Sequence, residues 1–440
     1  MARDTSDDTP ISGTEELAAY LASGCRPKAD WRIGTEHEKF PFYTADHRPV
    51  PYEGPRGIRA ILDGMRAMLG WDPIMDGENI IGLVEPTGQG AISLEPGGQF
   101  ELSGAPLETI HQTYREGNAH LAQVREIAGP LGIGFLGMGG SPKWTLAETP
   151  RMPKSRYQIM TNYMPKVGSH GLDMMYRTCT IQVNLDFASE ADMRRKMQVA
   201  LKLQPVATAL FASSPFTEGR PNGLVSWRSE IWRDTDNNRA GLMPFAFSAD
   251  FGFADYVEWA LDVPMYFVLR GGRYHDGTHV TFRQFMAGAL ADEIPDGRPT
   301  MGDWTNHLST LFPEVRLKRF LEMRGADGGP WRRICALPAF WVGLLYDEVL
   351  ELRNAVPREG IHAVFRNRSV REIAREVLAI SSAGLASRRR LNAEGFDEAD
   401  FLAPLEEIVA RGKTAAEQML DEFHTIWGAS IEPIFLEYAY

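Results

Sequence analysis

The sequence predicts an α+β fold with an antiparallel or mixed sheet, and three observations support this class. Strand-like segments dominate from about residue 30 to 330, whereas the pattern over 331–440 is helical. Strands followed by helices, without regular alternation, favour α+β over a doubly wound βαβ fold. The content of 44% hydrophobic and 10% aromatic residues is typical of a large folded protein. Because no repeat or linker interrupts the chain, we expect one domain over 13–440, after a disordered tail over 1–12.

The helices are indicated by capping signals and apolar periodicity. The first is expected in SGTEELAAYLASG, which starts with Ser and Glu capping signals and ends at Gly24. The alternating segment RTCTIQVNLDF is the clearest strand, and MYFVLR is a shorter one. Further amphipathic patterns predict helices at about 55–70, 106–129, 190–212 and several within 330–428.

Charge and cysteine content exclude several classes of partner. Lys and Arg number 46 against 58 Asp and Glu, a net charge of −12, so neither nucleic acid nor an anionic membrane is expected as a partner. The chain has three cysteines, Cys25, Cys179 and Cys335, without a CxxC pair, which indicates a reducing compartment. The acidic N-terminus lacks the features of a signal peptide, so we expect a cytoplasmic protein.

The segment IGTEHEKF, residues 33–40, reads as a half-buried strand with an unusual polar face. Side chains alternate along a strand, so Glu36 and Glu38 project together, while His37 and Lys39 point the other way. Two carboxylates held this close repel each other unless water or a cation offsets their charge. A single pair of this kind is usually a solvent-facing stripe, and His37 is expected to be structural.

Three further expected strands repeat this pattern. In AISLEPGGQFELSG, Glu95 and Glu101 have the same parity, although Pro96 to Gly98 could form a bulge that resets it. In RTCTIQVNLDF, alternate residues starting at Cys179 form an apolar face, and the opposite face is rich in amide and hydroxyl groups. In EVRLKRFLEMRGAD, one face carries a carboxylate beside basic groups. The polar faces of the last two strands include Gln182, Asn184, Arg316, Lys318, Glu322 and Arg324.

These strands together indicate metal-assisted phosphoryl transfer. Carboxylate oxygens are the ligands that Mg²⁺ and Mn²⁺ prefer, and these cations also bind phosphates. Guanidinium groups suit the phosphate or carboxylate groups that such a site must hold. The candidate metal ligands are Glu36, Glu38, Glu95, Glu101 and Glu322, and the candidate phosphate-binding residues are Arg316, Lys318 and Arg324.

The stretches quoted above, together with WRSEIWRDTDNNRAG, LDVPMYFVLR and PWRRICALPAFWVGLLYD, resemble glutamate-cysteine ligases of the plant and proteobacterial type. The resemblance runs from about residue 30 to the C-terminus. It implies a fold like that of glutamine synthetase, in which a curved antiparallel sheet forms an active-site funnel packed with helices. It also implies that 13–440 is a single catalytic domain, which joins the γ-carboxylate of L-glutamate to the amine of L-cysteine through γ-glutamyl phosphate, the first step of glutathione biosynthesis.

The resemblance assigns roles to particular residues. The five glutamates would share two or three Mg²⁺ ions, or Mn²⁺ in their place, and Arg324, Glu322 and Glu38 would be catalytic. Arg316, Lys318 and Arg324 would bind the phosphates of ATP. Substrate binding would fall to Gln182, Asn184, Arg228, Arg233 and Tyr266. The expected partners are therefore ATP, L-glutamate and L-cysteine, with a homodimer left open.

Several alternatives remain at this point. A related ligase could join glutamate to a different amine, since spacing does not resolve the acceptor pocket. A catalytically silent metal-binding scaffold would be expected to lack some of the five glutamates, and a metal-dependent hydrolase would need a general base that we do not find. Arg228 or Arg233 could equally form a surface ion pair, and Tyr266 could pack in the core. We also expect little redox switching, because Cys179 and Cys335 read as buried thiols.

Overall fold

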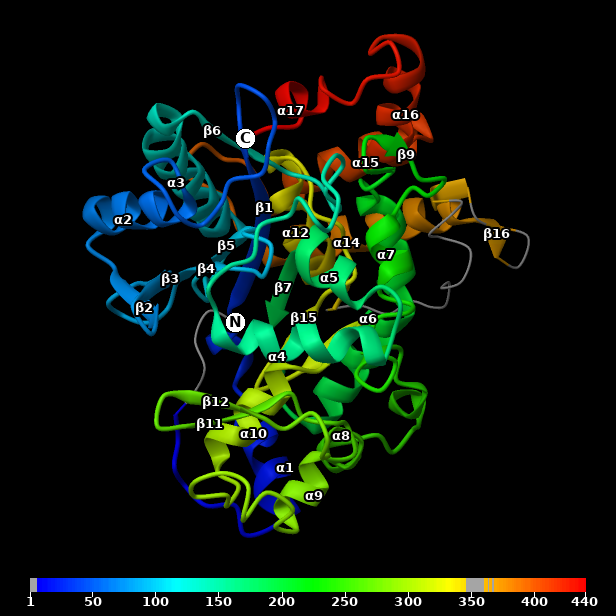
Figure 1. Ribbon diagram of the computed structural model, residues 1–440. Coiled ribbons are helices and arrows are strands. Elements are labelled where there is room, and N and C mark those ends of the chain that lie inside the picture. The colour runs from blue at the N-terminus through cyan, green and yellow to red at the C-terminus, as the bar shows by residue number, and fades with distance from the viewer. Residues whose placement is uncertain (1–5, 346–359, 363, 366–367) are drawn as a thin grey trace.

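A large antiparallel sheet runs through the centre of the molecule (Figure 1). The computed structural model describes residues 6–345, 360–362, 364–365 and 368–440. The sheet has nine strands in the order β14-β15-β7-β1-β5-β4-β3-β2, with β6 also paired to β1. Their bounds are β1 (Ile33–Tyr43), β2 (Asp72–Asp76), β3 (Asn79–Val84), β4 (Ala91–Leu94), β5 (Phe100–Ser103), β6 (Ile133–Leu136), β7 (Ile181–Leu185), β14 (Val315–Leu317) and β15 (Leu321–Met323). The predicted α+β class with a large antiparallel sheet is confirmed.

Strand β1 lies at the middle of this sheet and is buried on both faces. Its first part pairs with β7 on one edge and β5 on the other, and its last four residues pair with β6. The sequence predicted a half-buried strand, which is wrong because the face that carries His37 and Lys39 is covered by helix α3 (Ile110–Ala128). His37 is 1% exposed and its ring lies edge-on to that of His120 on α3, with centroids 5.6 Å apart.

Two segments that the sequence predicted as single strands are β-hairpins. The chain turns between β4 and β5, where the Glu95 amide donates to the Gln99 carbonyl and Gly98 adopts a φ of +86°. It turns again between β14 and β15, so that Arg316 lies directly opposite Glu322. Cross-strand partners in both hairpins are separated by an even number of residues. The side chains predicted to share one face therefore still share it, although each predicted single strand is a hairpin.

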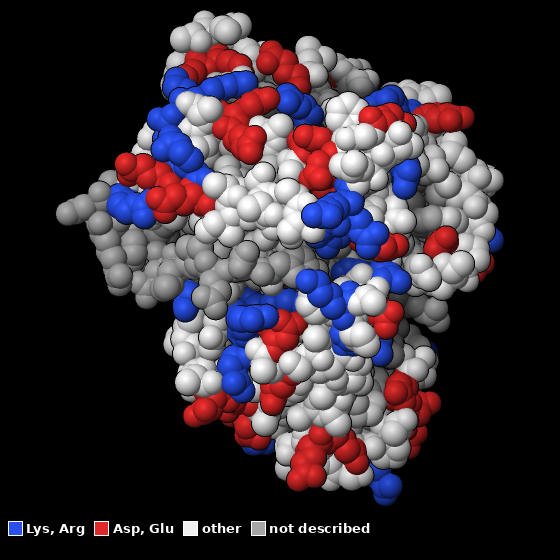
Figure 2. All heavy atoms as spheres, turned by 180° about the vertical axis from the view of Figure 1, so that it is seen from behind, with Lys and Arg blue, Asp and Glu red and all other residues white. Residues whose placement is uncertain are grey.

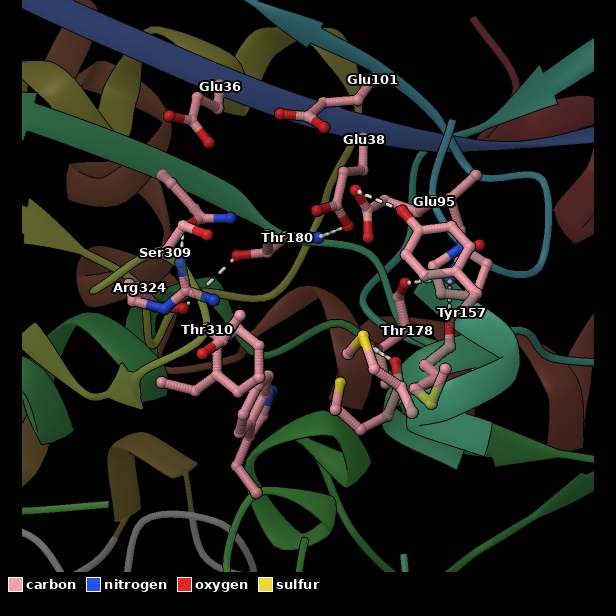
Figure 3. Close-up of a pocket in the computed structure, with 18 of the residues that line it drawn as sticks. Glu36, Glu38, Glu95, Glu101, Tyr157, Thr178, Thr180, Ser309, Thr310 and Arg324 are labelled. Atoms are coloured by element: carbon pink, nitrogen blue, oxygen red, sulfur yellow. Dashed lines mark hydrogen bonds between the residues drawn. The ribbon is translucent and has the colours of Figure 1, made fainter. Parts of the chain in front are cut away.

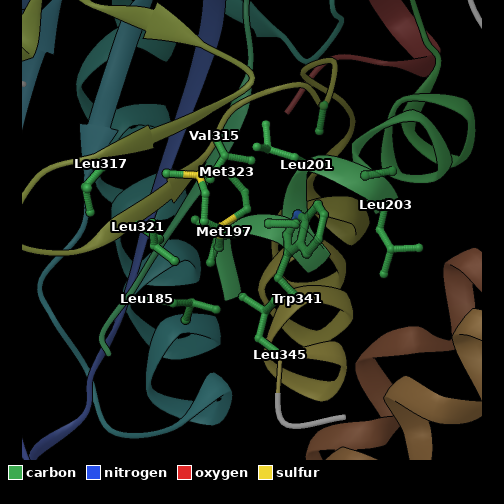
Figure 4. Packing of buried hydrophobic residues seen from close by; sticks show 14 of the residues in the cluster. Leu185, Met197, Leu201, Leu203, Val315, Leu317, Leu321, Met323, Trp341 and Leu345 are labelled. Carbon is green, nitrogen blue, oxygen red and sulfur yellow. The ribbon is translucent and has the colours of Figure 1, made fainter. Parts of the chain in front are cut away.

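Helices α6 (Glu190–Phe211) and α12 (Ala336–Leu344) cover the apolar face of β7, β15 and β14 (Figure 4). The alternate residues of these strands that point to this face are buried, as the sequence predicted. The packed side chains include Leu185, Val315, Leu317, Leu321 and Met323 from the strands, Met197 and Leu201 from α6, and Trp341 from α12. Because one face is fully committed to this core, the polar side chains of the same strands must project to the opposite face.

The predicted helices are largely confirmed. The helix expected from 106 begins at Ile110, where Thr109 forms a capping box with Gln112. The part of the helical C-terminal region over 346–359 lies outside the described residues. The other long helices are α1 (Thr14–Ala22), α2 (Ile58–Leu69), α14 (Val370–Arg388), α15 (Ala403–Arg411) and α16 (Ala415–Thr425). In the part of the chain that the structure describes, no helix is both long and apolar enough to cross a membrane.

Shorter elements connect these parts. The additional helices are α4 (Ser155–Tyr163), α5 (Gly171–Arg177), α7 (Trp227–Ile231), α8 (Phe253–Leu261), α9 (Phe282–Met286), α10 (Met301–Ser309), α11 (Trp331–Ile334) and α17 (Ile434–Glu437). The two-stranded pairs are β8 (Phe216–Thr217) with β9 (Arg220–Pro221), β10 (Ala240–Gly241) with β13 (Phe312–Pro313), β11 (Phe267–Arg270) with β12 (Arg273–Asp276), and β16 (Val364–Phe365) with β17 (Arg368–Ser369). Of the expected tail, residues 1–5 lie outside the described residues, and residues 7–11 hydrogen-bond to 299–302.

The charged side chains are intermixed over one face of the molecule. Figure 2 shows this face from behind, with acidic and basic groups alternating over the upper part and basic groups gathering across the waist. The net charge of −12 is therefore not concentrated in one patch on this face.

Candidate active site

A pocket of about 110 Å³ lies on the polar face of the central sheet (Figure 3). Strands β1, β5 and β7 and the turn before β5 contribute one wall, and the β14–β15 hairpin contributes the opposite one. Helices α4, α5 and α7 close the remaining side. The two walls come from parts of the chain almost 300 residues apart, and the sheet register brings them together through β7.

The first wall carries four glutamates, three of them on neighbouring strands. Glu36 and Glu38 project from β1 to the same side, as predicted, and Glu38 is the direct cross-strand partner of Glu101 on β5. Glu95 joins them from the turn between β4 and β5. Figure 3 shows Glu38, Glu95 and Glu101 gathered at one end of the pocket, with Glu36 on the side of Arg324.

Neutral donors fix the orientation of these carboxylates. Asn184 donates from its side-chain amide to Glu36 over 2.8 Å, and the backbone amide of Thr180 donates to Glu38 over 3.0 Å. Glu101 accepts from the hydroxyls of Ser93 and Ser103, over 2.6 and 2.7 Å. In the described part of the chain, none of the four glutamates forms an ion pair with a basic side chain. Their carboxylates are therefore oriented without a contact ion pair, although the more distant charges of Lys154, Arg156 and Arg228 act on Glu95, Glu101 or Glu38.

Two of these glutamates, Glu38 and Glu95, have a raised pKa. Burial raises the pKa of Glu38 well above its ordinary value, and the charges of Glu95 and Glu101 raise it further. Burial and the charge of Glu101 likewise raise the pKa of Glu95. A buried group of carboxylates with this property binds either protons or a metal cation.

The opposite wall is a compact network around one carboxylate. Glu322 on β15 has no exposed surface and accepts from the side chains of Arg316, Lys318 and Arg324. Arg316 does so over 2.6 Å, and Lys318 over 2.8 Å. Although burial opposes it, the charges of these three groups hold the pKa of Glu322 well below its ordinary value. The charge of Glu322 is therefore paired within the chain, and the four groups together carry a net charge of +2.

Arg228 on α7 completes the basic side. It is 3% exposed, and its guanidinium donates to the carbonyl of Arg324 over 3.0 Å. Its backbone amide donates to the hydroxyl of Ser214, which in turn donates to the buried carboxylate of Asp327. Arg324 donates to the side-chain carbonyl of Gln182 over 2.6 Å. Burial lowers the pKa of Arg228, and the nearby charge of Asp327 opposes this effect.

The structure brings most of the predicted site residues together. The pocket is lined by Glu36, Glu38, Glu95, Glu101, Gln182, Arg228, Arg316 and Arg324. Asn184 supports Glu36 from the same strand face, and Glu322 with Lys318 lies behind the arginines, outside the pocket lining. Glu322 was expected to share the metal ions with the other glutamates, but its oxygens are here taken by three basic side chains.

Two predicted substrate contacts lie elsewhere. Arg233 is absent from the pocket lining and pairs with Glu230 over 2.8 Å, with 55% of its side chain exposed. Tyr266 is 1% exposed and its ring stacks under the guanidinium of Arg239, 3.7 Å from the ring centroid. The structure therefore fits the alternatives considered from the sequence: a surface ion pair for Arg233 and core packing for Tyr266.

Several lining residues carried no signal in the sequence. Tyr157 on α4 donates from its hydroxyl to the carbonyl of Leu94 over 3.0 Å, beside Glu95. Trp232 and Phe312 line the basic side, where both rings face the guanidinium of Arg324. These residues come from short helices and loops without periodicity. Only the aromatic content near WRSEIWRD could have pointed to Trp232.

The donor set fits a hard divalent cation bound together with a ligand. Among the described residues, no three acidic, histidine or cysteine side chains converge closely enough to hold a metal ion by themselves. Mg²⁺ usually takes only one or two carboxylates from the protein and completes its shell with water and substrate phosphates. Uncompensated carboxylates without histidine or thiolate partners at the pocket wall match that mode of binding.

Comparison with known proteins identifies the family. The profile of glutamate-cysteine ligase family 2 (GCS2) matches residues 32–437. The chain belongs to this family. The chloroplastic glutamate-cysteine ligase of Nicotiana tabacum is 56% identical over 97% of this chain and 83% of its own length. The corresponding enzyme of Arabidopsis thaliana is 55% identical over 97% of this chain and 83% of its own length.

A solved structure of a glutamate-cysteine ligase has a fold similar to that of this chain. The crystal structure of a glutamate-cysteine ligase from Francisella tularensis in complex with AMP aligns with a TM-score of 0.58, over 93% of this chain and 87% of that one. The two sequences are 11% identical, so this likeness concerns the fold alone.

The plant members of the family correct one expectation. Both are named as chloroplastic enzymes, as is the 55% identical ligase A of Oryza sativa subsp. indica. These names contradict the cytoplasmic location that we expected from the sequence. The expectation depended on cysteine content and on the lack of a secretory signal, whereas organelle targeting is read from a cleavable segment that leaves no trace in the folded domain.

Proposed function

We propose that this glutamate-cysteine ligase joins the γ-carboxylate of L-glutamate to the amine of L-cysteine at the expense of ATP, through γ-glutamyl phosphate. The product, γ-glutamylcysteine, is the first intermediate of glutathione biosynthesis. A free carboxylate is a poor acyl donor because oxide is a poor leaving group, and phosphorylation provides a better one. We also propose that the sheet forms an active-site funnel like that of glutamine synthetase. The pocket on the polar face of the sheet supports this.

The observation that carries the proposal is the opposition of two charged walls across one pocket. Uncompensated carboxylates face guanidinium groups, with a pocket of about 110 Å³ between them. Phosphoryl transfer from ATP to a carboxylate brings many negative oxygens into one place, and both walls are needed to hold them. A hydrolase would instead require a positioned general base beside a water site.

The acidic wall would hold the metal. We assign Glu36, Glu38, Glu95 and Glu101 as the residues that bind Mg²⁺, or Mn²⁺ in its place, together with phosphate oxygens. When bound, such an ion neutralises charge on the phosphates of ATP. Asn184 and Thr180 keep the carboxylates of Glu36 and Glu38 pointing to the pocket before any ligand arrives.

The basic wall would hold the transferred group and the amino-acid substrate. Arg324 and Arg316 line the pocket and are fixed by Glu322, so their guanidinium groups can stabilise the phosphoryl group without rearrangement. Arg228, whose side chain is nearly fully buried, would pair with a substrate carboxylate. Glu322 acts in this arrangement by positioning the arginines, and Lys318 adds to their support.

The test is ADP release from purified protein with Mg²⁺ and ATP, followed by mass spectrometry of the products. Release that needs both L-glutamate and L-cysteine, with γ-glutamylcysteine formed, is the expected result. If ADP is released with glutamate and cysteine does not increase the rate, the acyl-phosphate chemistry would stand. The protein would then be a ligase that joins glutamate to a different amine. No release with any amine would contradict the proposal.

A further inference from the structure

A second hollow, separate from the active site, lies between α11, α15, α16 and the residues after α17. Its volume is about 220 Å³, and it shares no lining residue with the pocket on the sheet. We call it the α11–α16 groove. Four basic side chains, Arg332, Arg333, Arg411 and Lys413, line it together with one acidic side chain, Glu407. The lining therefore has an excess of three positive charges, in a chain whose net charge is −12.

Arg333 is the unusual member of this groove. Only 7% of the residue is exposed, and its Nη1 atom is buried without a hydrogen-bond partner in the described part of the chain. Burial lowers the pKa of Arg333 to about 10. A buried guanidinium with an unused donor is costly, because the protein supplies no group that replaces its lost water. An anion in the groove would supply that group.

The other three cations form the outer part of the groove. Arg332, Arg411 and Lys413 have 58%, 61% and 56% of their side chains exposed. Glu407 lies 3.3 Å from each of the two arginines and holds them on the same side, while Lys413 pairs with Asp421 outside the lining. A buried cation with exposed cations around it makes a floor and a rim, which is the arrangement expected for a small charged ligand rather than for a macromolecular surface.

The groove offers further favourable features for an anion. Ala415, the first residue of the 11-residue helix α16, lines it, so the N-terminal end of this helix lies at the hollow, where Thr414 and Glu417 cap it. Tyr438 lines the same hollow and is near enough to Arg333 to affect its pKa.

We propose that the α11–α16 groove is a second ligand site, which binds a small phosphate-bearing anion with Arg333 at its floor and Arg332, Arg411 and Lys413 at its rim. Guanidinium groups bind phosphate oxygens in a bidentate manner, and several of them together suit a group with more than one negative charge. The excess of three positive charges matches a diphosphate better than a single carboxylate. The site is independent of the proposed ligase reaction.

The experiment is calorimetric titration of the full chain with inorganic pyrophosphate, with succinate as a dicarboxylate comparator. Pyrophosphate can also enter the active site, so the variants identify the groove. Arg333→Met should remove one class of site or weaken it by about 10-fold or more, because the charge at the floor is lost. Lys413→Gln should weaken the same site by roughly 3-fold and reduce its salt dependence. Arg390→Gln, which changes an arginine 47% exposed and paired with Glu108, is the matched control and should bind as the unchanged chain does.

Folding and ligase activity separate this proposal from the preceding one. Arg333→Met removes a buried cation that has an unused donor, so its thermal midpoint should stay equal or rise; if it does not fold, Lys413→Gln carries the test. Ligation at saturating substrates should remain within about 2-fold in all three variants, because none lines the active site. Binding of pyrophosphate to Arg333→Met with unchanged stoichiometry and affinity would overturn the proposal. Equal affinity for succinate would overturn its assignment to phosphate.

Discussion

The two walls of the active-site pocket are both buried and both charged, but they are built in opposite ways. On the basic wall Glu322 accepts from Arg316, Lys318 and Arg324, so these four charges have partners within the chain. On the acidic wall the glutamates are oriented by hydroxyl and amide groups, and no basic side chain of the described residues pairs with them. The carboxylate of one wall is paired within the chain, whereas those of the other have no ion-pair partner, which is the reason we propose a cation from solution there.

This difference separates two roles that the sequence could not separate. Charges with partners inside the chain stabilise the fold and remain in place during the reaction. Charges without such partners destabilise the free protein and are retained for ligand binding. The same substitution, a glutamate to glutamine, should therefore have opposite effects on stability in the two walls.

The largest expected effect is that of Glu322→Gln. Three buried cations would lose their common partner, so the free energy of unfolding should fall by about 3–5 kcal/mol, and turnover should be lost as the arginines move. Urea denaturation followed by tryptophan fluorescence measures the first effect. Glu258→Gln, at an exposed pair with Arg283, is the control and should cost about 1 kcal/mol or less. A Glu322→Gln protein as stable as the control would show that the network does not hold this wall.

In contrast, Glu38→Gln should lose activity without losing stability. The change removes one buried charge from a group of like charges, so the free energy of unfolding should stay equal or rise by on the order of 1 kcal/mol. Turnover should fall by roughly 10³-fold, since a metal contact contributes several kcal/mol to the transition state. Steady-state ADP release and the same denaturation experiment measure both. A near-normal rate would remove Glu38 from the proposed metal site.

A smaller loss is expected from Arg324→Lys. An ammonium group keeps the charge next to Glu322, but it has a single nitrogen and cannot hold Gln182 and Glu322 while also presenting a planar pair of donors to a phosphoryl group. We expect turnover to fall by about 100-fold with little change in stability. Measurement of kcat and KM for ATP distinguishes the outcomes, because a change in KM alone would mean that Arg324 only binds the nucleotide.

The pH dependence of stability should also distinguish the walls. Glu38 and Glu95 have a raised pKa in the folded protein, so the stability they contribute is present below their unfolded pKa of about 4.5 and is lost as the pH rises through their folded values. Glu322 has a lowered pKa, so its contribution is present above about 4.5 and is lost only as the pH falls through its folded value.

Denaturation without Mg²⁺ between pH 5 and 8 tests this contrast. The acidic wall should make the unchanged chain lose stability as the pH rises across this range, by on the order of 1 kcal/mol, and Glu38→Gln should reduce that loss. Addition of Mg²⁺ at pH 8 should restore stability by binding to the folded state. An identical pH profile in the variant would show that Glu38 does not carry an uncompensated charge.

The smallest effect is expected at Arg233. Because its side chain is 55% exposed and paired with Glu230, Arg233→Gln should change kcat/KM for glutamate and cysteine by less than about 2-fold. Arg228→Gln is the matched comparison, and there the loss should exceed about 10-fold, since that guanidinium lines the pocket. A large loss at Arg233 would mean that the loop after α7 moves to the substrate.

Much of the fold was accessible from the sequence because it depends on alternation. The faces of β1 and β7, the apolar core under α6 and α12, and most helix positions follow from period-2 and period-3.6 patterns. The β14–β15 hairpin was missed because Lys318 to Phe320 carry no strong turn signal, and the β4–β5 hairpin because Pro96 to Gly98 was interpreted as a possible bulge within one strand. Parity alone is the same for a strand and for its hairpin.

The site was predicted less evenly. Carboxylates on strands with matching parity could be placed on one face, but a sequence does not show which of them will meet a basic partner. Glu322 and Glu38 looked alike for this reason, although their surroundings are opposite. Arg228 and Arg233 also looked alike, and only the short helix α7 decides that the first is buried and the second exposed. Such differences depend on tertiary contacts.

The position of β1 at the centre of the sheet has a consequence for synthesis of the chain on the ribosome. Glu36 and Glu38 emerge early, but β7 and the β14–β15 hairpin follow only after residues 181 and 315. At 5–20 residues per second, roughly a quarter of a minute to a minute separates Glu38 from Glu322. For about the first half of this time, until β7 (Ile181–Leu185) is made, the β7 side of β1 lacks that partner strand, and the nascent chain is expected to rely on chaperones that shield an open sheet edge.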